Sequence, residues 1–471
     1  MTLRRTRGIA PALIVIVGLG LPSPAVTAPR QRAAARRVLA MAVRAVGGEA
    51  ALRELRTFSA RSSGRRWILD EGAAPGGAAR PSATFDLRLR YALGRGRPRD
   101  RMRLDFVRTS SGGERPVREV ISRSSGYISG VDANFSAPAT KAMTSDRWAA
   151  IRAEQHLLNP HVLLRKALKR PRVASAGGTR RIGGRTFRVL VIKDRVAPIK
   201  LLIDTATGRI ARLRTLQHDY LRRDVRVEVR YRRWRAAGDA LRFPTRLRLS
   251  VDGEMVLRER RSSVTANRTF ARRVFRFPAG VEAPFERVLA RRGAKTSEWL
   301  VSFANLGFIK DGRQSTVSPL RVAPGVFLIQ GSVNNSMVVR RDAGALVVEG
   351  ALHELRTRAV VSWIRERFPD QRITHIVNTH HHSDHSGGMR GYVAGGARAV
   401  VHEAAADFFA EVFAERDSTV LPDELDRRSR LARIRSVPAD GFTRLNDDLR
   451  PVEVYPIQND HSVDGVIVLY R

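Results

Sequence analysis

The sequence predicts an α+β protein in two parts, a mainly antiparallel β domain followed by a domain that mixes strands and helices. The chain has 471 residues, which exceeds the size at which single hydrophobic cores stop growing. Its first half alternates apolar and polar residues between turn signals, as antiparallel strands do. Its last third places short apolar strands before and after an amphipathic helical segment. These observations together favour two domains.

In the N-terminal part, a short helix is expected over Arg32 to Val46, ended by Gly47-Gly48. Strand alternation follows, and glycine-containing turns should join strands into hairpins. The alternating residues are Phe85, Leu87, Leu89 and Tyr91, and the turns are Gly183-Gly184, Thr207-Gly208, Gly238-Asp239 and Asp252-Gly253. An amphipathic segment from Trp148 to Leu168, interrupted at Pro160, is expected to lie across the sheet. This layout resembles the curved half-barrel of periplasmic lipoprotein-carrier proteins. Its apolar face could hold a lipid, pack on the second domain or simply form core, and core is the default.

The N-terminus has the pattern of a secretory signal peptide. Arginines at positions 4, 5 and 7 precede the apolar stretch Ile9 to Leu21, and Val26-Thr27-Ala28 fits a cleavage site. An uncleaved anchoring segment is the alternative, because Pro29 disfavours cleavage after Ala28. The chain contains no cysteine, which excludes disulfides and lipid modification of an N-terminal cysteine. We therefore expect residues 1–28 to be a signal peptide and the protein to be exported, to the periplasm or the extracellular space.

Four histidines and an aspartate fall within His380-His381-His382-Ser383-Asp384-His385. The apolar run Ile373 to Val377 predicts a buried strand before them, and Ser386-Gly387-Gly388 allows a sharp turn after them. Residues two apart on such a strand-to-loop exit can converge on one ion, and the later pair can reach a second. The spacing predicts a site for two divalent metal ions.

This motif resembles the H-x-H-x-D-H signature of the metallo-β-lactamase superfamily. The expected strands at Gly325–Ile329, Ser336–Val339 and Ala345–Glu349, and the amphipathic segment ending at Pro369, agree with its order of elements. The resemblance implies an αββα metallo-β-lactamase fold. It also implies that a bridging aspartate and a final histidine would follow Arg471, so that the domain is expected to be incomplete here.

The resemblance implies the ligands as well. The first ion would be held by His380, His382 and His461, which follows the expected strand Val452–Ile457, and the second by Asp384 and His385. Asp384 would also orient the attacking water, as the catalytic residue. His375, His402 and Glu403 are expected to be structural, and His381 to point away from the ligands as a supporting or exposed residue.

The function implied is an exported metal-dependent hydrolase that uses a zinc-bound hydroxide on an ester, a lactam amide or a related bond of a small-molecule substrate. Imidazole ligands favour zinc, with iron or manganese as alternatives. Two other hypotheses stay open: a protein that binds a lipid or another lipophilic ligand and carries a degenerate metal domain, and a nuclease of the same superfamily. Export disfavours a nucleic-acid substrate.

The formal net charge is +40, and the arginines are spread over the whole chain. Such a charge predicts attraction to anionic surfaces or lipids at low salt. The Pro/Gly/Arg-rich stretch from Phe277 to Lys295 lacks periodicity over most of its length, which predicts a linker. We therefore place the β-rich domain at residues 29–295 and the metal-binding domain at residues 296–471.

Overall fold

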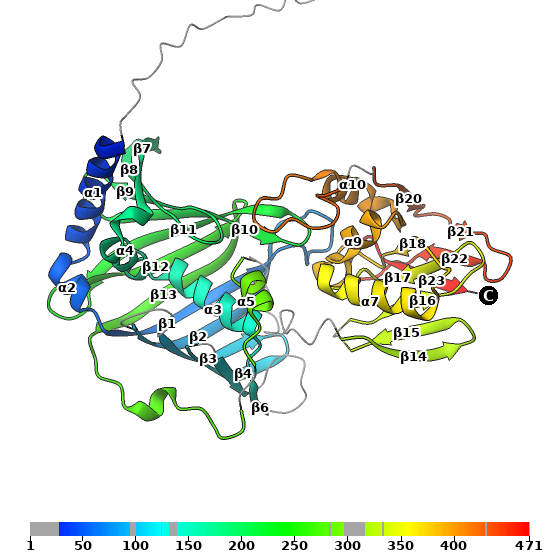
Figure 1. Ribbon diagram of the computed structural model, residues 1–471, viewed down its shortest axis with the longest axis horizontal. Coiled ribbons are helices and arrows are strands. Elements are labelled where there is room, and N and C mark those ends of the chain that lie inside the picture. Colours follow the sequence, from blue (N-terminus) through cyan, green and yellow to red (C-terminus); the bar gives the residue numbers. More distant parts are fainter. Residues whose placement is uncertain are drawn as a thin grey trace, which may run out of the picture.

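The computed structural model describes residues 28–94, 100–123, 125–130, 139–281, 284–295, 316–331, 334–428 and 431–470. The described residues form two domains, which lie side by side in Figure 1. Most of the expected signal peptide lies outside the described residues, since the first described helix begins at Ala28. Within the described part, no helix combines the length and the hydropathy that crossing a membrane requires.

The N-terminal domain is built on one 13-stranded sheet in which every pair of neighbouring strands is antiparallel. The strand order is β6-β5-β4-β3-β2-β1-β13-β12-β11-β10-β9-β8-β7. The first and last strands of this domain, β1 and β13, therefore pair in the middle of the sheet. The strands are β1 (Thr57–Ile68), β2 (Arg80–Ala92), β3 (Arg101–Ser110), β4 (Gly113–Ser122), β5 (Ser125–Gly130), β6 (Ala139–Ala142), β7 (Ala174–Ile182), β8 (Arg185–Ile192), β9 (Ile199–Asp204), β10 (Ile210–Asp219), β11 (Arg223–Ala236), β12 (Arg242–Val251) and β13 (Glu254–Ala266).

The predicted hairpins are confirmed. Gly183-Gly184 joins β7 to β8, Gly208 lies between β9 and β10, Gly238 lies between β11 and β12, and Gly253 lies between β12 and β13. All five of these glycines have positive φ, a conformation that side chains disfavour, so the turn residues themselves fix the strand pairing. The predicted alternation in β2 also holds, because Phe85, Leu89 and Tyr91 are buried and Leu87 is half-buried against the same core.

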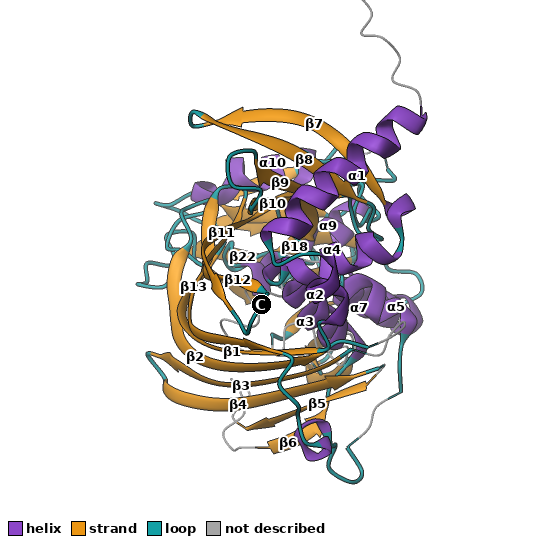
Figure 2. Cartoon of the chain, turned by 90° about the vertical axis from the view of Figure 1, so that its left-hand side faces the viewer, coloured by secondary structure: helices purple, strands orange, loops and turns teal. Residues whose placement is uncertain are grey.

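Helices cover the concave face of this sheet (Figure 2). They are α1 (Ala28–Ala45), α2 (Glu49–Glu54), α3 (Ser145–Leu158), α4 (Pro160–Lys169) and α5 (Arg287–Gly293), with 3-10 turns at Pro171–Val173 and Arg272–Phe275. The break expected at Pro160 separates α3 from α4, since proline is tolerated at the first position of a helix but not inside one. Apolar side chains of α1 to α4 and of the sheet form one core.

The stretch predicted to be a linker contains α5, which packs against α3. The backbone N–H of Glu286 donates to Ser145 Oγ at 2.8 Å, and Gly293 meets the backbone of Asp146 so closely that a Cβ would not fit. The helix itself therefore packs with the N-terminal domain, and the boundary at residue 295 stays a prediction.

The C-terminal domain contains two sheets. The larger has the order β14-β15-β16-β17-β18-β19-β20 and is parallel from β17 to β20. The smaller has the order β21-β22-β23. The strands are β14 (Ser318–Ala323), β15 (Val326–Gln330), β16 (Ser336–Val339), β17 (Ala345–Val348), β18 (Ile373–Val377), β19 (Arg398–His402), β20 (Ile434–Val437), β21 (Thr443–Leu445), β22 (Val452–Pro456) and β23 (Val466–Tyr470), and the helices are α7 (Glu354–Arg367), α8 (Ser383–Ser386), α9 (Met389–Ala394) and α10 (Ala406–Ala414), with a 3-10 turn at Glu403–Ala405.

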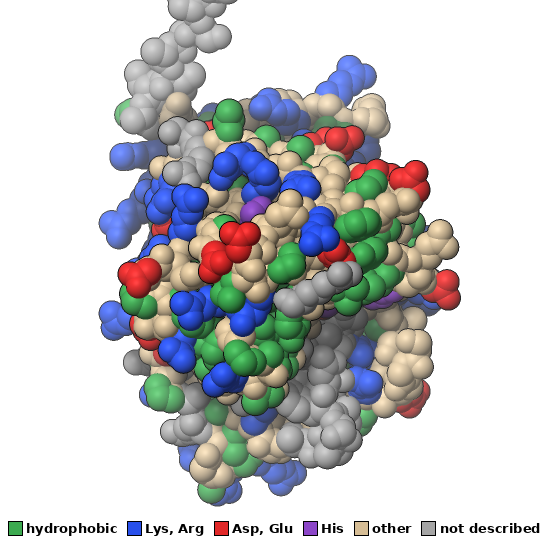
Figure 3. Space-filling view, turned by 90° about the vertical axis from the view of Figure 1, so that its right-hand side faces the viewer, with side chains coloured by type: hydrophobic (Ala, Val, Ile, Leu, Met, Phe, Trp, Pro, Cys, Tyr) green, Lys and Arg blue, Asp and Glu red, His purple; other side chains and the backbone are tan. Residues whose placement is uncertain are grey.

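Two hydrophobic clusters order these elements into layers. One cluster joins the larger sheet to α7, α9 and α10, and the other joins its opposite face to the smaller sheet. The described residues thus form an α layer and two β layers of the expected αββα fold. Edge strands β14 and β23 expose apolar side chains, among them Leu320, Val322, Ile467 and Leu469, and hydrophobic side chains gather on this end of the molecule (Figure 3).

Candidate metal centre

The histidine cluster leaves the larger sheet at the carboxyl end of β18, where side chains of neighbouring parallel strands meet. Asn378, the first residue after β18, hydrogen-bonds to Val400 through its backbone and to the His380 carbonyl through its amide. Ser386 Oγ donates to the carbonyls of His381 and His382 at 2.8 and 2.9 Å. These bonds fix the loop backbone and thereby the directions of its imidazoles.

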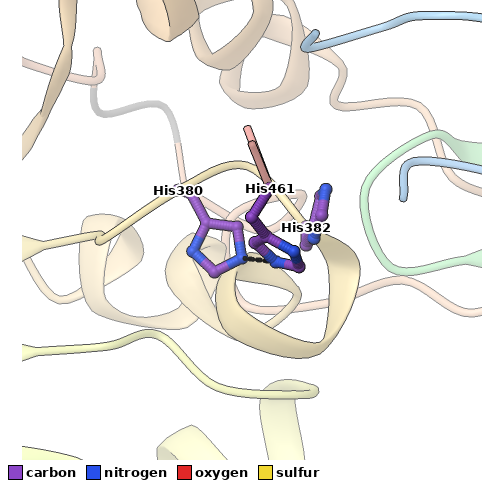
Figure 4. A group of neighbouring side chains, drawn as sticks. All are labelled: His380, His382 and His461. Carbon is purple, nitrogen blue, oxygen red and sulfur yellow. Dashed lines mark hydrogen bonds between the residues drawn. The ribbon is translucent and has the colours of Figure 1, made fainter. Parts of the chain in front are cut away.

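Three of the predicted ligands converge. His380 and His382 come from the loop after β18, and His461 comes from the loop between β22 and β23 (Figure 4). Each offers a ring nitrogen, and these nitrogens all lie within 4.8 Å of one another. His380 Nε2 and His461 Nε2 are 3.2 Å apart. Such a spacing is close to that of tetrahedral zinc ligands, which lie about 2.0–2.1 Å from the ion.

The remaining ring nitrogens of two of these histidines have partners of the kind that orient metal ligands. His380 Nδ1 lies 3.0 Å from Thr379 Oγ1, which in turn donates to the Glu349 carboxylate. His382 Nε2 lies 2.8 Å from the carbonyl oxygen of Gly72 and, as the nitrogen facing a carbonyl, donates to it. His382 Nδ1 is therefore the nitrogen left for a metal ion.

The electrostatic surroundings keep these imidazoles neutral. Burial, together with the neighbouring imidazoles, lowers the pKa of His380 far below its usual value. Burial also lowers the pKa of His382 to about 4, and burial and His385 lower that of His461. Neutral imidazole is the form that binds a metal ion.

Asp384 and His385 also reach the centre, each beside a different carboxylate. His385 groups with Glu349 and His380, and Asp384 groups with Glu71 and His382. His385 Nδ1 is 3.3 Å from Glu349 Oε1, and His385 Nε2 is 3.7 Å from Asp384 Oδ2. Among the described residues, the buried atoms Asp384 Oδ1 and Glu349 Oε2 have no hydrogen-bond partner. Buried carboxylate oxygens without partners beside imidazole nitrogens are a donor set that fits divalent metal ions.

Charge interactions also shift the pKa values of the groups around this cluster. Burial and the Asp384 carboxylate raise the pKa of Glu71 to about 8. Burial acts to lower the pKa of His385, but Glu349, Asp384 and Glu71 outweigh it and raise that pKa to about 9. Both shifts arise because carboxylates and imidazoles are crowded together in a buried site, an arrangement in which a bound cation would stabilise the ionised carboxylates.

The other histidines of the region lie outside these groups. His381 belongs to none of the ligand groups and is fully buried, with its Nδ1 2.7 Å from Asp464 Oδ1. His402 Nδ1 accepts the backbone N–H of Ala404 at 3.1 Å, and His375 Nδ1 lies 3.2 Å from a nitrogen of Arg341.

Sequence reasoning missed two carboxylates, Glu349 and Glu71. Glu349 follows β17 directly and has a φ of 74°, and its place after a strand that neighbours β18 is a signal that could have identified it. Glu71 lies in the loop between β1 and β2 of the other domain. No local pattern in the sequence marks that residue.

Comparison with known proteins separates the two domains. Residues 329–470 match the metallo-beta-lactamase superfamily, whereas no curated protein is similar to the chain in sequence. Solved structures that align with the chain include an outer membrane lipoprotein-sorting protein domain from Vibrio parahaemolyticus (11% identity, 53% of this chain and 97% of that one, TM-score 0.33). They also include a DUF1329 family protein from Desulfovibrio piger (11% identity, 51% of this chain and 97% of that one, TM-score 0.34).

A metallo-beta-lactamase from Pontibacter korlensis aligns at 22% identity over 32% of this chain and 66% of that one, with a TM-score of 0.25. A metallo-beta-lactamase from Cronobacter sakazakii aligns over 60% of its own length, so the chain spans about two thirds or less of these enzymes. The fold class predicted from the sequence agrees with the architecture and with the superfamily match. Residues 329–470 are a region of the metallo-β-lactamase superfamily, preceded in the chain by a large antiparallel β-sheet domain.

Proposed function

We propose that this protein is a metal-dependent hydrolase that cleaves an ester, a lactam amide or a related bond of a small-molecule substrate. The observation that carries the proposal is the convergence of His380, His382 and His461 from two loops, with ring nitrogens within 4.8 Å of one another. Membership of residues 329–470 in the metallo-β-lactamase superfamily supports it.

In this proposal His380, His382 and His461 hold the first ion, and Asp384 and His385 contribute to a second. A bound ion supplies a water of lowered pKa, near 7 for zinc, and polarises the bond under attack. Three imidazoles favour zinc, whereas the carboxylates nearby also suit manganese or iron. Asp384 orients the attacking water and accepts its proton at Oδ1, the atom that is buried without a hydrogen-bond partner among the described residues.

The test is metal content and turnover of the full chain. Purified protein should hold a transition metal, and His380→Ala and His461→Ala should each lose most of it and lower hydrolysis at least a hundredfold on any ester, lactam or phosphodiester that wild type cleaves. His375→Ala is the matched control, because His375 lies on β18 outside the ligand groups. Unchanged metal content in the His380 and His461 variants would refute the ligand assignment.

We also propose that the protein is exported. The charged, apolar and small-residue segments at the N-terminus support this proposal. Intact-mass measurement of protein recovered from the periplasm should show a chain shortened near Ala28. A full-length chain confined to the cytoplasm would contradict it.

A further inference from the structure

The loop between β1 and β2 of the N-terminal domain reaches the candidate metal centre. Its Gly72 carbonyl accepts from His382 Nε2 at 2.8 Å, and its Ala73 carbonyl accepts from the backbone N–H of Val463 at 2.8 Å. One short segment of the first domain therefore contacts both loops that carry the histidine ligands. It has the position of a wall of the metal centre.

The same segment brings a carboxylate to the ligands. Glu71 is 7% exposed, and its Oε1 accepts a hydrogen bond from Ser383 Oγ at 2.9 Å. Its Oε2 lies 3.6 Å from His382 Nδ1, the nitrogen that the Gly72 hydrogen bond leaves available. Ligand atoms of Glu71, His382 and Asp384 lie within 4.8 Å of one another. His382 Nδ1 belongs to the first ion, so the second position lies between Glu71 and Asp384. Two atoms bound at about 2.1 Å to one ion are at most about 4.2 Å apart, so only a small adjustment separates these two carboxylates from coordination of a shared ion.

The backbone that presents Glu71 is held in an unfavourable conformation. Asp70 has a φ of 54°, which is rare for a residue with a side chain. Arg222, from the hairpin between β10 and β11, fixes it through three hydrogen bonds of 2.7 to 3.1 Å to its carboxylate. Such strain persists only where the surrounding structure determines it, and it concentrates at functional sites. Part of the stability of the N-terminal domain therefore offsets the strain that places Glu71.

We infer that Glu71 is a metal ligand that the N-terminal domain supplies to a second metal position, shared with Asp384 and beside His382. The inference rests on the proposed function and adds to it a ligand from outside the superfamily region. An anionic oxygen suits a divalent transition ion at a site where Asp384 already contributes carboxylate. Because the ligands come from both domains, binding of the second ion also stabilises the contact between the domains.

The experiment uses the full chain, freed of metal by chelation and titrated with Zn²⁺ by calorimetry and with Co²⁺ by visible absorption. Wild type should bind a second equivalent more weakly than the first. Glu71→Gln keeps an oxygen that accepts from Ser383 but has no negative charge. It should therefore weaken the affinity for the second equivalent of metal at least tenfold and change the Co²⁺ absorption bands of that equivalent. The affinity for the first equivalent should stay unchanged. Glu71→Asp keeps a carboxylate and should retain part of the affinity.

Two further variants separate ligation from other effects. Glu114→Gln makes the same charge change at an exposed position of the same domain and should bind like wild type. Ser383→Ala removes the hydrogen bond to Glu71 but not the carboxylate. It should therefore lose less affinity for the second equivalent of metal than Glu71→Gln does.

Equal second-site affinities in Glu71→Gln and Glu114→Gln would overturn the inference and leave the proposed function standing. If Ser383→Ala lost as much second-site affinity as Glu71→Gln, the claim that Glu71 binds the ion directly would be overturned. Absence of any metal binding by wild type would overturn both the inference and the proposed function.

Discussion

Three residues with side chains adopt left-handed backbone conformations around the metal centre: Asp70, Glu349 and Leu352, with φ of 54°, 74° and 64°. Each such residue costs about 1–3 kcal/mol unless its surroundings compensate. Hydrogen bonds to the backbone of Glu349 illustrate the compensation, since its N–H donates to Val377 at 2.9 Å and its carbonyl accepts from Ser336 Oγ at 3.0 Å. The conformation of Glu349 is therefore held by β16 and β18, the strands on either side of β17.

At this scale the sequence predicted the candidate ligands that share a motif and missed the nearby carboxylates that do not. His380, His382, Asp384 and His385 lie in one loop, so their spacing alone brings them together. His461 could be placed because it follows an alternating strand. Glu71 and His382 are brought together only by packing between domains, and that packing has no local signature.

Buried histidines away from the metal centre should make stability sensitive to acid. His161 is fully buried, and its ring stacks on that of Phe243 with the ring centroids 3.7 Å apart. Its Nε2 lies 2.8 Å from the Arg242 carbonyl oxygen. Burial lowers its pKa from 6.5 to about 3, so below pH 6.5 the unfolded chain binds a proton that the folded chain does not. This contribution to stability is present above pH 6.5 and declines as pH falls from 6.5 towards 3.

Between pH 7.5 and pH 5, His161 should account for a loss of about 2 kcal/mol. His161→Phe keeps the stacking and cannot be protonated, so it should be less stable at pH 7.5 but lose less stability on acidification. Urea unfolding at the two pH values measures the difference. Parallel losses in wild type and variant would show that His161 does not titrate in this way.

At the scale of elements, local chemistry determined what could be predicted. The four predicted glycine turns each join a hairpin, and Pro160 separates two helices, because these residues act on the backbone where they stand. The pairing of β1 with β13, which joins Phe58 to Ala266, could not be predicted. This pairing brings together two strands that are far apart in the sequence, and the residues of either strand do not indicate which distant strand will lie beside it.

The hairpin between β10 and β11 is a second element that joins the domains. Arg223, 1% exposed, contacts Asp426 at 2.5 Å and Asp423 at 3.4 Å, and Arg390 binds the same two aspartates from within the C-terminal domain. Removal of one partner from a buried ion network leaves uncompensated charge, which is strongly destabilising. The hairpin should therefore be a point where the domain contact is sensitive to substitution.

Arg223→Ala should lower stability by about 3–5 kcal/mol and make the protein more susceptible to proteolysis. Arg226→Ala is the matched control, since its side chain is 82% exposed and 3.4 Å from Asp252, and it should change stability by less than about 1 kcal/mol. Unfolding curves and limited proteolysis measure both effects. Similar behaviour of the two variants would contradict a role for the buried network.

At the scale of the whole molecule, two of the contacts that the N-terminal domain makes with the C-terminal domain lie on connected parts of its structure. The β1–β2 loop meets the histidine loops, the β10–β11 hairpin meets the segment around Asp423, and Arg222 of that hairpin binds Asp70 of the loop. A displacement of the hairpin would therefore also disturb Glu71. The β1–β2 loop and the β10–β11 hairpin are thus linked to each other where they meet the C-terminal domain.

The outer face of that sheet, away from the helices, carries arginines directly opposite one another on successive strands. One row runs through Arg212, Arg230, Arg248, Arg258 and Arg65, and a second through Arg232, Arg246 and Arg260. Like charges opposite one another destabilise a sheet. Glu228 pairs with Arg212 and Arg230, whereas the second row forms no ion pair among the described residues. Part of the positive charge of the chain is thus arranged in rows on one face of the fold.

We expect this face to attract anionic lipid surfaces, at about 1 kcal/mol per arginine near the surface. The full chain should co-sediment with vesicles containing anionic phospholipid at about 25 mM salt, and binding should fall steeply by about 300 mM as charges are screened. Replacement of Arg232, Arg246 and Arg260 by Gln should weaken binding at least tenfold. The control replaces three exposed arginines of the C-terminal domain, Arg365, Arg372 and Arg435, which changes the net charge equally but leaves the rows intact. If both triple variants lose the same affinity, total charge and not the arrangement of arginines on the sheet governs the attraction.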